Sequence, residues 1–99
     1  MALTYEWDEE KSRNNVRKHG VSFEEAKTIF NDPFAITIGD PDHSFSEERF
    51  LEIGMSAKGR ILVVWYAERG DNIRVIGCRK ATRSEWRKYE ERKTQFGRR

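Results

Sequence analysis

The sequence predicts a single α+β domain over residues 1–99. Two N-terminal helices and a C-terminal helix should pack on an antiparallel sheet of about four strands, with a short extra strand at the N-terminus. Three observations predict this fold. Apolar residues recur with helical spacing near both ends of the chain, they alternate with a period of two between residues 34 and 78, and the connections in that middle region are too short for parallel crossovers.

The N-terminal quarter predicts a short strand followed by a helix. The aromatic stretch at 5–7 precedes Asp8, whose carboxylate can accept hydrogen bonds from the first amides of a helix. The helix should end near His19, because its last turn is basic and Gly20 can adopt the left-handed conformation that terminates helices.

Ser22 and Glu25 have the spacing of a capping box and predict the start of a second helix. In that motif the Ser22 hydroxyl accepts from the Glu25 amide, and the Glu25 carboxylate reaches back to the Ser22 amide. Apolar residues then recur with helical spacing until Asp-Pro at 32–33 ends the pattern. The residues expected to face the core are Phe23, Ala26, Ile29 and Phe30.

The middle of the chain predicts the strands of an antiparallel meander. Alternation begins over 34–38, returns over 49–55, and is followed by the run 61–66, which is apolar on both faces and should be the central strand. Residues 73–78 form the last strand. Polar turns rich in Gly and Asp separate these runs.

Thr82 and Glu85 form a second capping box and predict a C-terminal helix. One stripe of that helix is expected to dock on the sheet, and residues 97–99 are expected to fray. The stripe consists of Trp86, Tyr89, Lys93 and Phe96.

Composition excludes several classes of protein. No apolar run approaches the roughly 20 residues of a membrane span, and the N-terminus lacks the basic and apolar regions of a signal peptide. Cys78 is the only cysteine, and the two histidines are far apart in sequence. We therefore expect a cytoplasmic protein with no disulfide, no membrane contact, no metal site and no cofactor.

Charge is distributed unevenly along the chain. The net charge of +2 combines a net of −5 over residues 1–73 (9 basic minus 14 acidic) with a net of +7 over residues 74–99 (10 basic minus 3 acidic). A clustered positive field attracts polyphosphate or an acidic protein partner. The cluster could equally be the solvated face of a helix.

Charged residues near the ends of the predicted strands could form a ribonuclease site. Attack of a ribose 2′-hydroxyl on the adjacent phosphate requires a proton acceptor and cations that stabilise the developing charge. Glu68 could accept the proton and arginines could supply the cations. Spacing alone favours a simpler interpretation, in which Glu68 forms a surface ion pair with Arg69 or Arg79. His43, in a polar loop, is a reserve general acid or base, although loop histidines are usually only solvated.

Short strings along nearly the whole chain, the longest of them near the N-terminus, form a recognisable set. They are Tyr-Glu-Trp-Asp at 5–8, Lys-His-Gly-Val-Ser-Phe-Glu-Glu-Ala at 18–26, Phe-Asn-Asp-Pro at 30–33, Glu-Arg-Phe at 48–50, Ile-Gly-Met-Ser at 53–56, Arg-Gly-Asp at 69–71 and Arg-Lys-Ala-Thr at 79–82. Together they resemble the signature of BrnT toxins.

The resemblance implies a RelE-like ribonuclease that arrests translation by cutting RNA. It also implies an antitoxin partner, BrnA, that neutralises the toxin, and a toxin-antitoxin complex that binds its own promoter with the antitoxin touching the DNA. The rival interpretations are a non-catalytic module that binds nucleic acid or a partner, and a degenerate toxin that acts as a corepressor with its antitoxin.

Charge type and position in these strings together select the candidate site residues. The catalytic candidates are Arg49, Glu68, Arg79 and Arg83. The RNA-binding candidates are Lys58, Arg60, Arg69, Arg74, Lys80 and Arg87. We expect their side chains to line a positively charged hollow where the sheet meets the C-terminal helix, and we expect the antitoxin to cover it. Trp65 is expected in the core, whereas Tyr66 could be core or could stack on a base.

Overall fold

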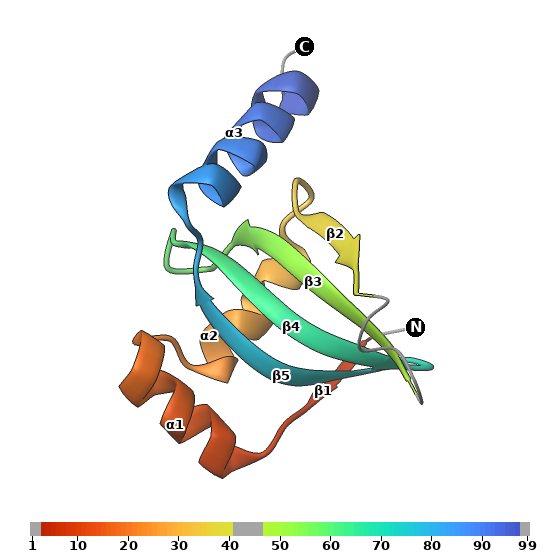
Figure 1. Cartoon of the computed structure of the whole chain (residues 1–99). Coiled ribbons are helices and arrows are strands. Elements are labelled where there is room, and N and C mark those ends of the chain that lie inside the picture. The colour runs from red at the N-terminus through yellow and green to blue at the C-terminus, as the bar shows by residue number, and fades with distance from the viewer. Residues whose placement is uncertain (1–2, 41–46, 98–99) are drawn as a thin grey trace.

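The computed structural model describes residues 3–40 and 47–97, and it confirms the predicted α+β architecture (Figure 1). In chain order the elements are β1 (Thr4–Glu6), α1 (Glu9–His19), α2 (Phe23–Lys27), the 3-10 helix η1 (Thr28–Asn31), β2 (Ile36–Gly39), β3 (Glu48–Met55), β4 (Ile61–Arg69), β5 (Asn72–Lys80) and α3 (Arg83–Gly97). None of the helices described is long and apolar enough to cross a membrane. His43 and the last two residues of the expected frayed tail lie outside the described ranges.

The five strands form one mixed sheet with the order β1-β5-β4-β3-β2. Neighbours from β2 to β5 are antiparallel, as their short connections require, and β4 is the central strand as predicted. β1 is far from β5 in sequence and pairs with it in parallel at the edge of the sheet.

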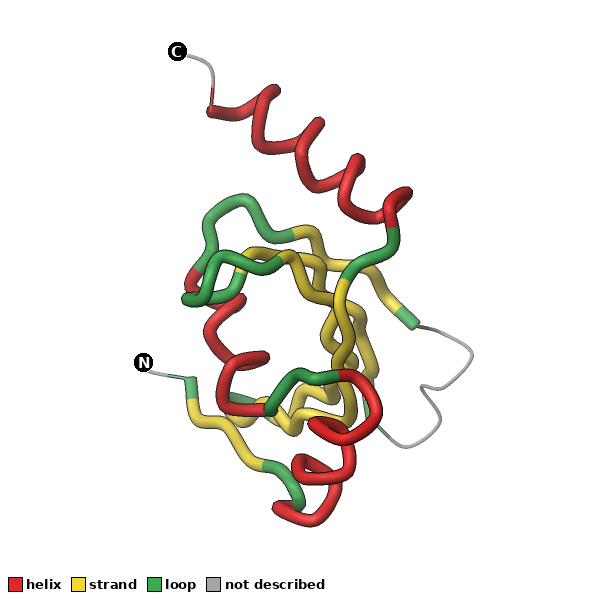
Figure 2. The backbone as a smooth tube through the Cα atoms, turned by 90° about the vertical axis from the view of Figure 1, so that its left-hand side faces the viewer, coloured by secondary structure: helices red, strands yellow, loops and turns green. Residues whose placement is uncertain are grey.

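Helix α2 covers one face of this sheet, and α1 lies against its β5 edge. Figure 2 shows α2 on one side and α1 below the sheet, while α3 extends beyond one end and leaves much of the other side without a helix. We call the side opposite α2 the open face. Between α2 and the sheet lies a core formed by Val21, Phe23, Ala26 and Ile29 with Leu62, Val64, Val75 and Cys78.

The predicted boundaries of α1 are confirmed. The Asp8 carboxylate accepts from the amides of Glu10 and Lys11 at 2.8 and 3.2 Å, and Gly20 ends the helix with a φ of 71°. The side-chain amide of Asn15 then joins α1 to β5, because its Nδ2 donates to the carbonyl oxygen of Cys78 at 2.9 Å. Because of this bond α1 is fixed against the edge of the sheet although it contributes little apolar surface.

The second helix differs from the prediction in two respects. It is α-helical only as far as Lys27 and tightens to the 3-10 form, consistent with the Thr28 hydroxyl donating back to the carbonyl of Glu25 at 2.6 Å. The Ser22 hydroxyl accepts from the Glu25 amide at 3.0 Å, as expected. The carboxylate of Glu25 does not close the capping box, because it is buried and points at Arg60 instead.

Arg60 therefore has a structural role that its sequence position did not reveal. Its Nε lies 2.9 Å from Oε2 of Glu25, its Nη2 contacts the other carboxylate oxygen and the carbonyl of Gly20, and Ser56 also donates to Glu25 at 2.7 Å. Only 3% of the Glu25 side chain is exposed. The hydrogen bonds from Arg60 lower the pKa of Glu25 despite its burial.

Helix α3 is attached at few points. Thr82 and Glu85 complete the predicted capping box in both directions, at 2.8 and 3.2 Å. Tyr89 is buried, and its hydroxyl donates to the Asp32 carboxylate at 2.6 Å. The expected docking of the whole stripe is wrong, since Trp86 and Phe96 are about half exposed (49% and 55%) on a helix that projects from the body (Figure 1).

We predict that Arg60→Ala destabilises the fold by roughly 2–3 kcal/mol, because it leaves the buried carboxylate of Glu25 without its cation. Urea unfolding at pH 7 measures this. Lys58→Ala is the matched control, since Lys58 is exposed in the same hairpin and should shift the free energy of unfolding by less than about 0.5 kcal/mol. Equal effects of the two variants would contradict the assigned role of Arg60.

A second prediction concerns the junction of β5 and α3. Arg79 donates two hydrogen bonds to Glu85, at 2.7 and 3.0 Å. These bonds lower the pKa of Glu85 from 4.5 to about 2; partial burial acts in the opposite direction, and the hydrogen bond from the Thr82 amide adds to the lowering. A carboxyl with a depressed folded-state pKa stabilises the fold above its unfolded pKa and loses that effect as pH falls toward the folded value.

Glu85→Gln should therefore lower the free energy of unfolding at pH 7 by roughly 1–3 kcal/mol. The difference from the wild type should shrink as pH falls from 4.5 to about 2. Urea titrations across this range provide the measurement, with Glu91→Gln, an exposed residue of the same helix, as the control. A difference that does not change with pH would show that the carboxylate charge is not responsible.

Candidate functional site

The register of the sheet brings two distant arginines into one row. Arg49 pairs with Ala67 across β3 and β4, and Ala67 pairs with Arg74 across β4 and β5. Paired residues on neighbouring strands project to the same face of a sheet, and this row shares the open face with Val63 by alternation. Because Ala67 is small and buried, the two long side chains can meet above it.

The carboxylate of Glu47 lies among three arginine side chains. Oε1 of Glu47 is 3.1 Å from Nε of Arg69, and Oε2 contacts Nη2 of Arg74 and lies 3.7 Å from Nε of Arg49. We call these four residues the arginine cluster. The Glu47 side chain is 11% exposed. Burial disfavours its ionised form, but the hydrogen bonds and charges of Arg69 and Arg74 outweigh that effect and lower its pKa.

A polar hollow of about 220 Å³ adjoins the cluster at the edge of β5. Arg49, Arg74 and Lys11 supply three cations to its lining, and Lys11 comes from the first turn of α1. The one acidic residue in the lining is Asp8, whose carboxylate already accepts from two amides as the cap of α1. The hollow therefore presents an excess of positive charge and is suited to an anion.

An aromatic hollow of about 170 Å³ lies next to the polar one and shares two residues with it, Arg49 and Ile76. Its other lining residues are Asp40, Phe50, Trp65 and Tyr66. A β-bulge creates this arrangement, because Trp65 pairs with Gly77 while Tyr66 pairs with Val75, so that Ile76 is the extra residue between them.

Trp65 also contacts a third arginine. The guanidinium of Arg79 lies 5.1 Å from the centroid of the Trp65 ring while it pairs with Glu85 of α3. Arg79 follows Arg74 by five residues along β5, which corresponds to roughly 16 Å of strand. Trp65 therefore lies between two cationic sites on the open face.

The two aromatic residues of β4 compare differently with expectation, since Trp65 is less buried than predicted and Tyr66 follows one of its two predicted alternatives. Trp65 packs against the core but is only partly buried, and it lines the aromatic hollow. Tyr66 is 3% exposed, and its hydroxyl donates to Glu52 at 3.0 Å. Its ring contacts Phe30 edge-on and stacks on Phe50, so the core interpretation holds for most of Tyr66.

The structure does not bring Glu68 to the arginines. Glu68 pairs with Glu48 and Ile73, which places it on the side of the sheet opposite the Arg49 row, and it is exposed. It forms no ion pair with any residue of 3–40 or 47–97, so the simple surface pair with Arg69 or Arg79 is not made either. Period-two alternation separates it from Arg69, its neighbour in sequence.

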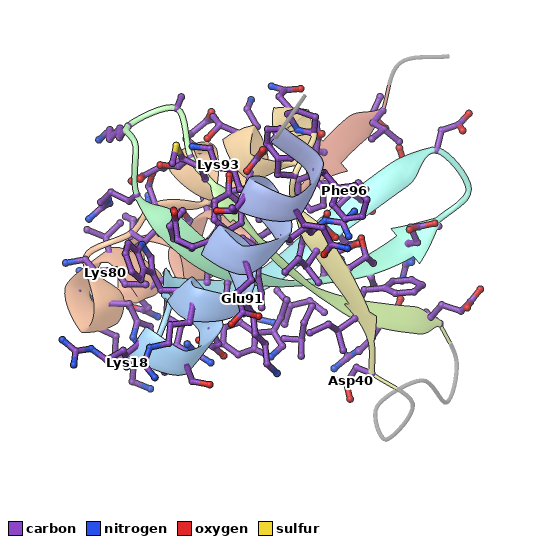
Figure 3. The ribbon with its side chains drawn as sticks, turned by 90° about the horizontal axis from the view of Figure 1, so that it is seen from above. Lys18, Asp40, Lys80, Glu91, Lys93 and Phe96 are labelled. Atoms are coloured by element: carbon purple, nitrogen blue, oxygen red, sulfur yellow. The ribbon has the colours of Figure 1, made fainter. Side chains whose placement is uncertain are left out.

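The other predicted cations lie away from the arginine cluster. Lys58 and Arg60 belong to the hairpin at the opposite end of β3 and β4, where Arg60 holds Glu25. Lys80 pairs with Leu62 and so lies on the helix side, and Figure 3 shows it on the same side as Lys18 of α1. Arg83 and Arg87 are exposed on α3, near Arg79 in sequence.

Sequence reasoning missed two residues of this site. Glu47 precedes β3 and shares the face of Arg49 by alternation, so the pattern Glu47-Glu48-Arg49 contained a usable signal. Lys11 approaches the arginines only because α1 folds against β5, and no local pattern indicates that. Within the described ranges, no group of three or more His, Cys, Asp or Glu side chains is placed to hold a metal ion.

Two comparisons with known proteins gave matches, one to a family model and one to a solved structure. The family model described as the ribonuclease toxin BrnT of type II toxin-antitoxin systems matches residues 7–85. The fold is similar to the crystal structure of the Brucella abortus ribonuclease toxin BrnT, with a TM-score of 0.62 and 24% sequence identity over 83% of this chain and all of that one. No curated protein matches the sequence.

Proposed function

Because the chain belongs to the BrnT family of ribonuclease toxins of type II toxin-antitoxin systems, we propose that it is a metal-independent endoribonuclease of the RelE-like kind that arrests translation in the cytoplasm. The observation that carries this proposal is the pair of adjoining hollows on the open face. One hollow is lined by Arg49, Arg74 and Lys11 and suits a phosphate, and the other is lined by Trp65 and suits a base.

The proposed reaction is an internal transfer within RNA. The 2′-hydroxyl loses its proton as its oxygen attacks the adjacent phosphorus, and the bond to the 5′-oxygen breaks as that oxygen takes up a proton. The products end in a 2′,3′-cyclic phosphate and a 5′-hydroxyl. Charge on the phosphorane is stabilised by the guanidinium groups of Arg49 and Arg74, whose planar forks match the geometry of phosphate oxygens. Fixed cations of this kind supply the electrostatic stabilisation that other nucleases obtain from a metal ion.

The remaining predicted residues fit this arrangement unequally. Arg79, beside Trp65, is placed to contact a second phosphate of a strand that crosses the open face, and Arg83 and Arg87 continue the positive charge along α3. Glu68 lies on the opposite face. Its assignment as proton acceptor stays a prediction that its geometry disfavours.

The proposed partner is a BrnA-type antitoxin, since a type II toxin requires a protein antitoxin. We propose that it covers the open face and blocks RNA by occlusion, and that the complex contacts promoter DNA through the antitoxin. One observation favours the alternative of a non-catalytic corepressor: the carboxylate nearest the arginines, Glu47, is held ionised by them and is a weak base.

Purified protein mixed with single-stranded RNA in EDTA distinguishes the two functions. A metal-independent nuclease should give fragments that end in cyclic phosphate, detectable by mass spectrometry. A binding module should give only a mobility shift that weakens with salt. Intact RNA after binding, together with normal growth of cells that express the protein alone, would reject the nuclease and support the corepressor.

Arg74→Ala should lower the cleavage rate about 100-fold, because it removes a guanidinium beside the reacting phosphate. Arg17→Ala is the matched control, since Arg17 is exposed on α1 and bonds only the nearby Asn14 among described residues. Glu68→Gln should cost less than about threefold, because Glu68 faces away from the cluster. A loss from Glu68→Gln as large as that from Arg74→Ala would restore Glu68 as the proton acceptor.

A further inference from the structure

In the free protein, the Glu47 carboxylate already occupies the position between the guanidinium groups of the arginine cluster. Both carboxylate oxygens of Glu47 are engaged, one by Arg69 and the other by Arg74 with Arg49 nearby. A guanidinium binds a carboxylate and the two non-bridging oxygens of a phosphodiester with the same paired geometry. Glu47 therefore pairs with two of the guanidinium groups, those of Arg49 and Arg74, that the proposed function assigns to RNA.

We propose that the Glu47 carboxylate is an internal competitor for the substrate: it occupies a phosphodiester site made by Arg49, Arg69 and Arg74, and RNA binds by displacing it. This inference rests on the proposed function for the identity of the ligand. It adds a binding site whose resting occupant belongs to the chain itself, and it assigns Glu47 a role other than catalysis.

An unpaired donor in the arginine cluster supports the view that RNA displaces Glu47, and argues against a permanent ion pair. The Nε of Arg74 is buried and has no hydrogen-bond acceptor among the described residues. A buried donor without an acceptor is costly, and in its resting position the Glu47 carboxylate reaches Nη2 of Arg74 and leaves Nε unpaired. A phosphodiester whose two non-bridging oxygens face Arg74 can engage Nε and a terminal nitrogen together, in the paired geometry that Glu47 does not make.

Space for the incoming group lies beside the cluster. The polar hollow of about 220 Å³ is lined by Arg49, Arg74 and Lys11 but not by Glu47. A phosphate in this hollow would meet two guanidinium groups of the cluster and the ammonium of Lys11. The electrostatic cost of releasing Glu47 is limited, because a freed carboxylate at the rim of the site regains solvation by water.

The competing explanation is that Glu47 positions the arginines, so that binding needs it. The two explanations predict opposite changes when its charge is removed. Glu48 is the matched control, since it is the adjacent glutamate, is exposed, and lies on the other face of β3. Neutralising either residue changes the net charge equally, so a general electrostatic effect on nucleic-acid binding would be shared by both variants.

The experiment measures binding of a fluorescent 2′-deoxy oligonucleotide, which lacks the attacking hydroxyl and cannot be cleaved. Glu47→Gln should lower the Kd about fivefold, in line with the modest strength of partly exposed ion pairs, while Glu48→Gln should change it less than about twofold. Equal effects of the two variants would overturn the proposal. Weaker binding by a folded Glu47→Gln protein would overturn it in favour of a positioning role.

A second measurement covers the case in which Glu47→Gln does not fold. In the wild-type protein, NMR signals of the Arg69 and Arg74 Nε–H groups should shift when inorganic phosphate is added, and signals of Arg17 should not. Unchanged Arg69 and Arg74 signals at saturating phosphate would overturn the proposal. Neither assay requires cleavage, so tighter binding by Glu47→Gln with no nuclease activity would uphold the competitor and reject the nuclease.

Discussion

The pairing of β4 with both of its neighbours is the constraint on which the rest of the structure depends. Leu62 and Val64 of this strand pack under α2, whereas Ile61 and Val63 pack toward α3, so neither face of β4 can slip by one residue without exposing a core side chain. The same register aligns Arg49 with Arg74. Burial of apolar residues at one end of the sheet thereby positions the charged residues at the other.

Concentrating cations on one face has an electrostatic cost, and the chain offsets it with two carboxylates. Glu47 neutralises the arginine cluster, and Glu85 neutralises Arg79 at the base of α3. Both carboxylates have lowered pKa values because guanidinium groups donate to them. The arginines of the cluster and Arg79 are therefore paired with carboxylates in the free protein, and under the proposed function RNA exchanges with these carboxylates. The proposed function then implies that each paired arginine contributes less to RNA binding than its charge alone suggests.

Local chemistry predicted most of the fold. Asp8 and Gly20 mark the two ends of α1, and Ser22 and Thr82 mark the starts of two further helices. The alternation of apolar and polar residues located the strands. Local reasoning failed where a side chain pairs with a residue far away in sequence. The Glu25 carboxylate pairs with Arg60 and not with the backbone amide of Ser22, because a buried carboxylate is stabilised more by a cation than by a neutral amide. The candidate site was predicted less well. The charge pattern identified its arginines but did not show which of them lie together. Side chains alternate between the two faces of a strand, so Glu68 and its neighbour Arg69 point to opposite faces.

By itself the sequence determined the fold class, the order of the elements, the cationic character of the C-terminal quarter and the resemblance to BrnT toxins, because each of these is encoded in spacing, capping and composition along the chain. Only the tertiary structure decided which charges meet. Glu47 reaches Arg69 and Arg74, more than twenty residues further along the chain, through strand register, and Lys11 reaches the same site through the docking of α1. The physical reason is that an ion pair forms within a few ångströms, and only the packed sheet brings residues so distant in sequence that close.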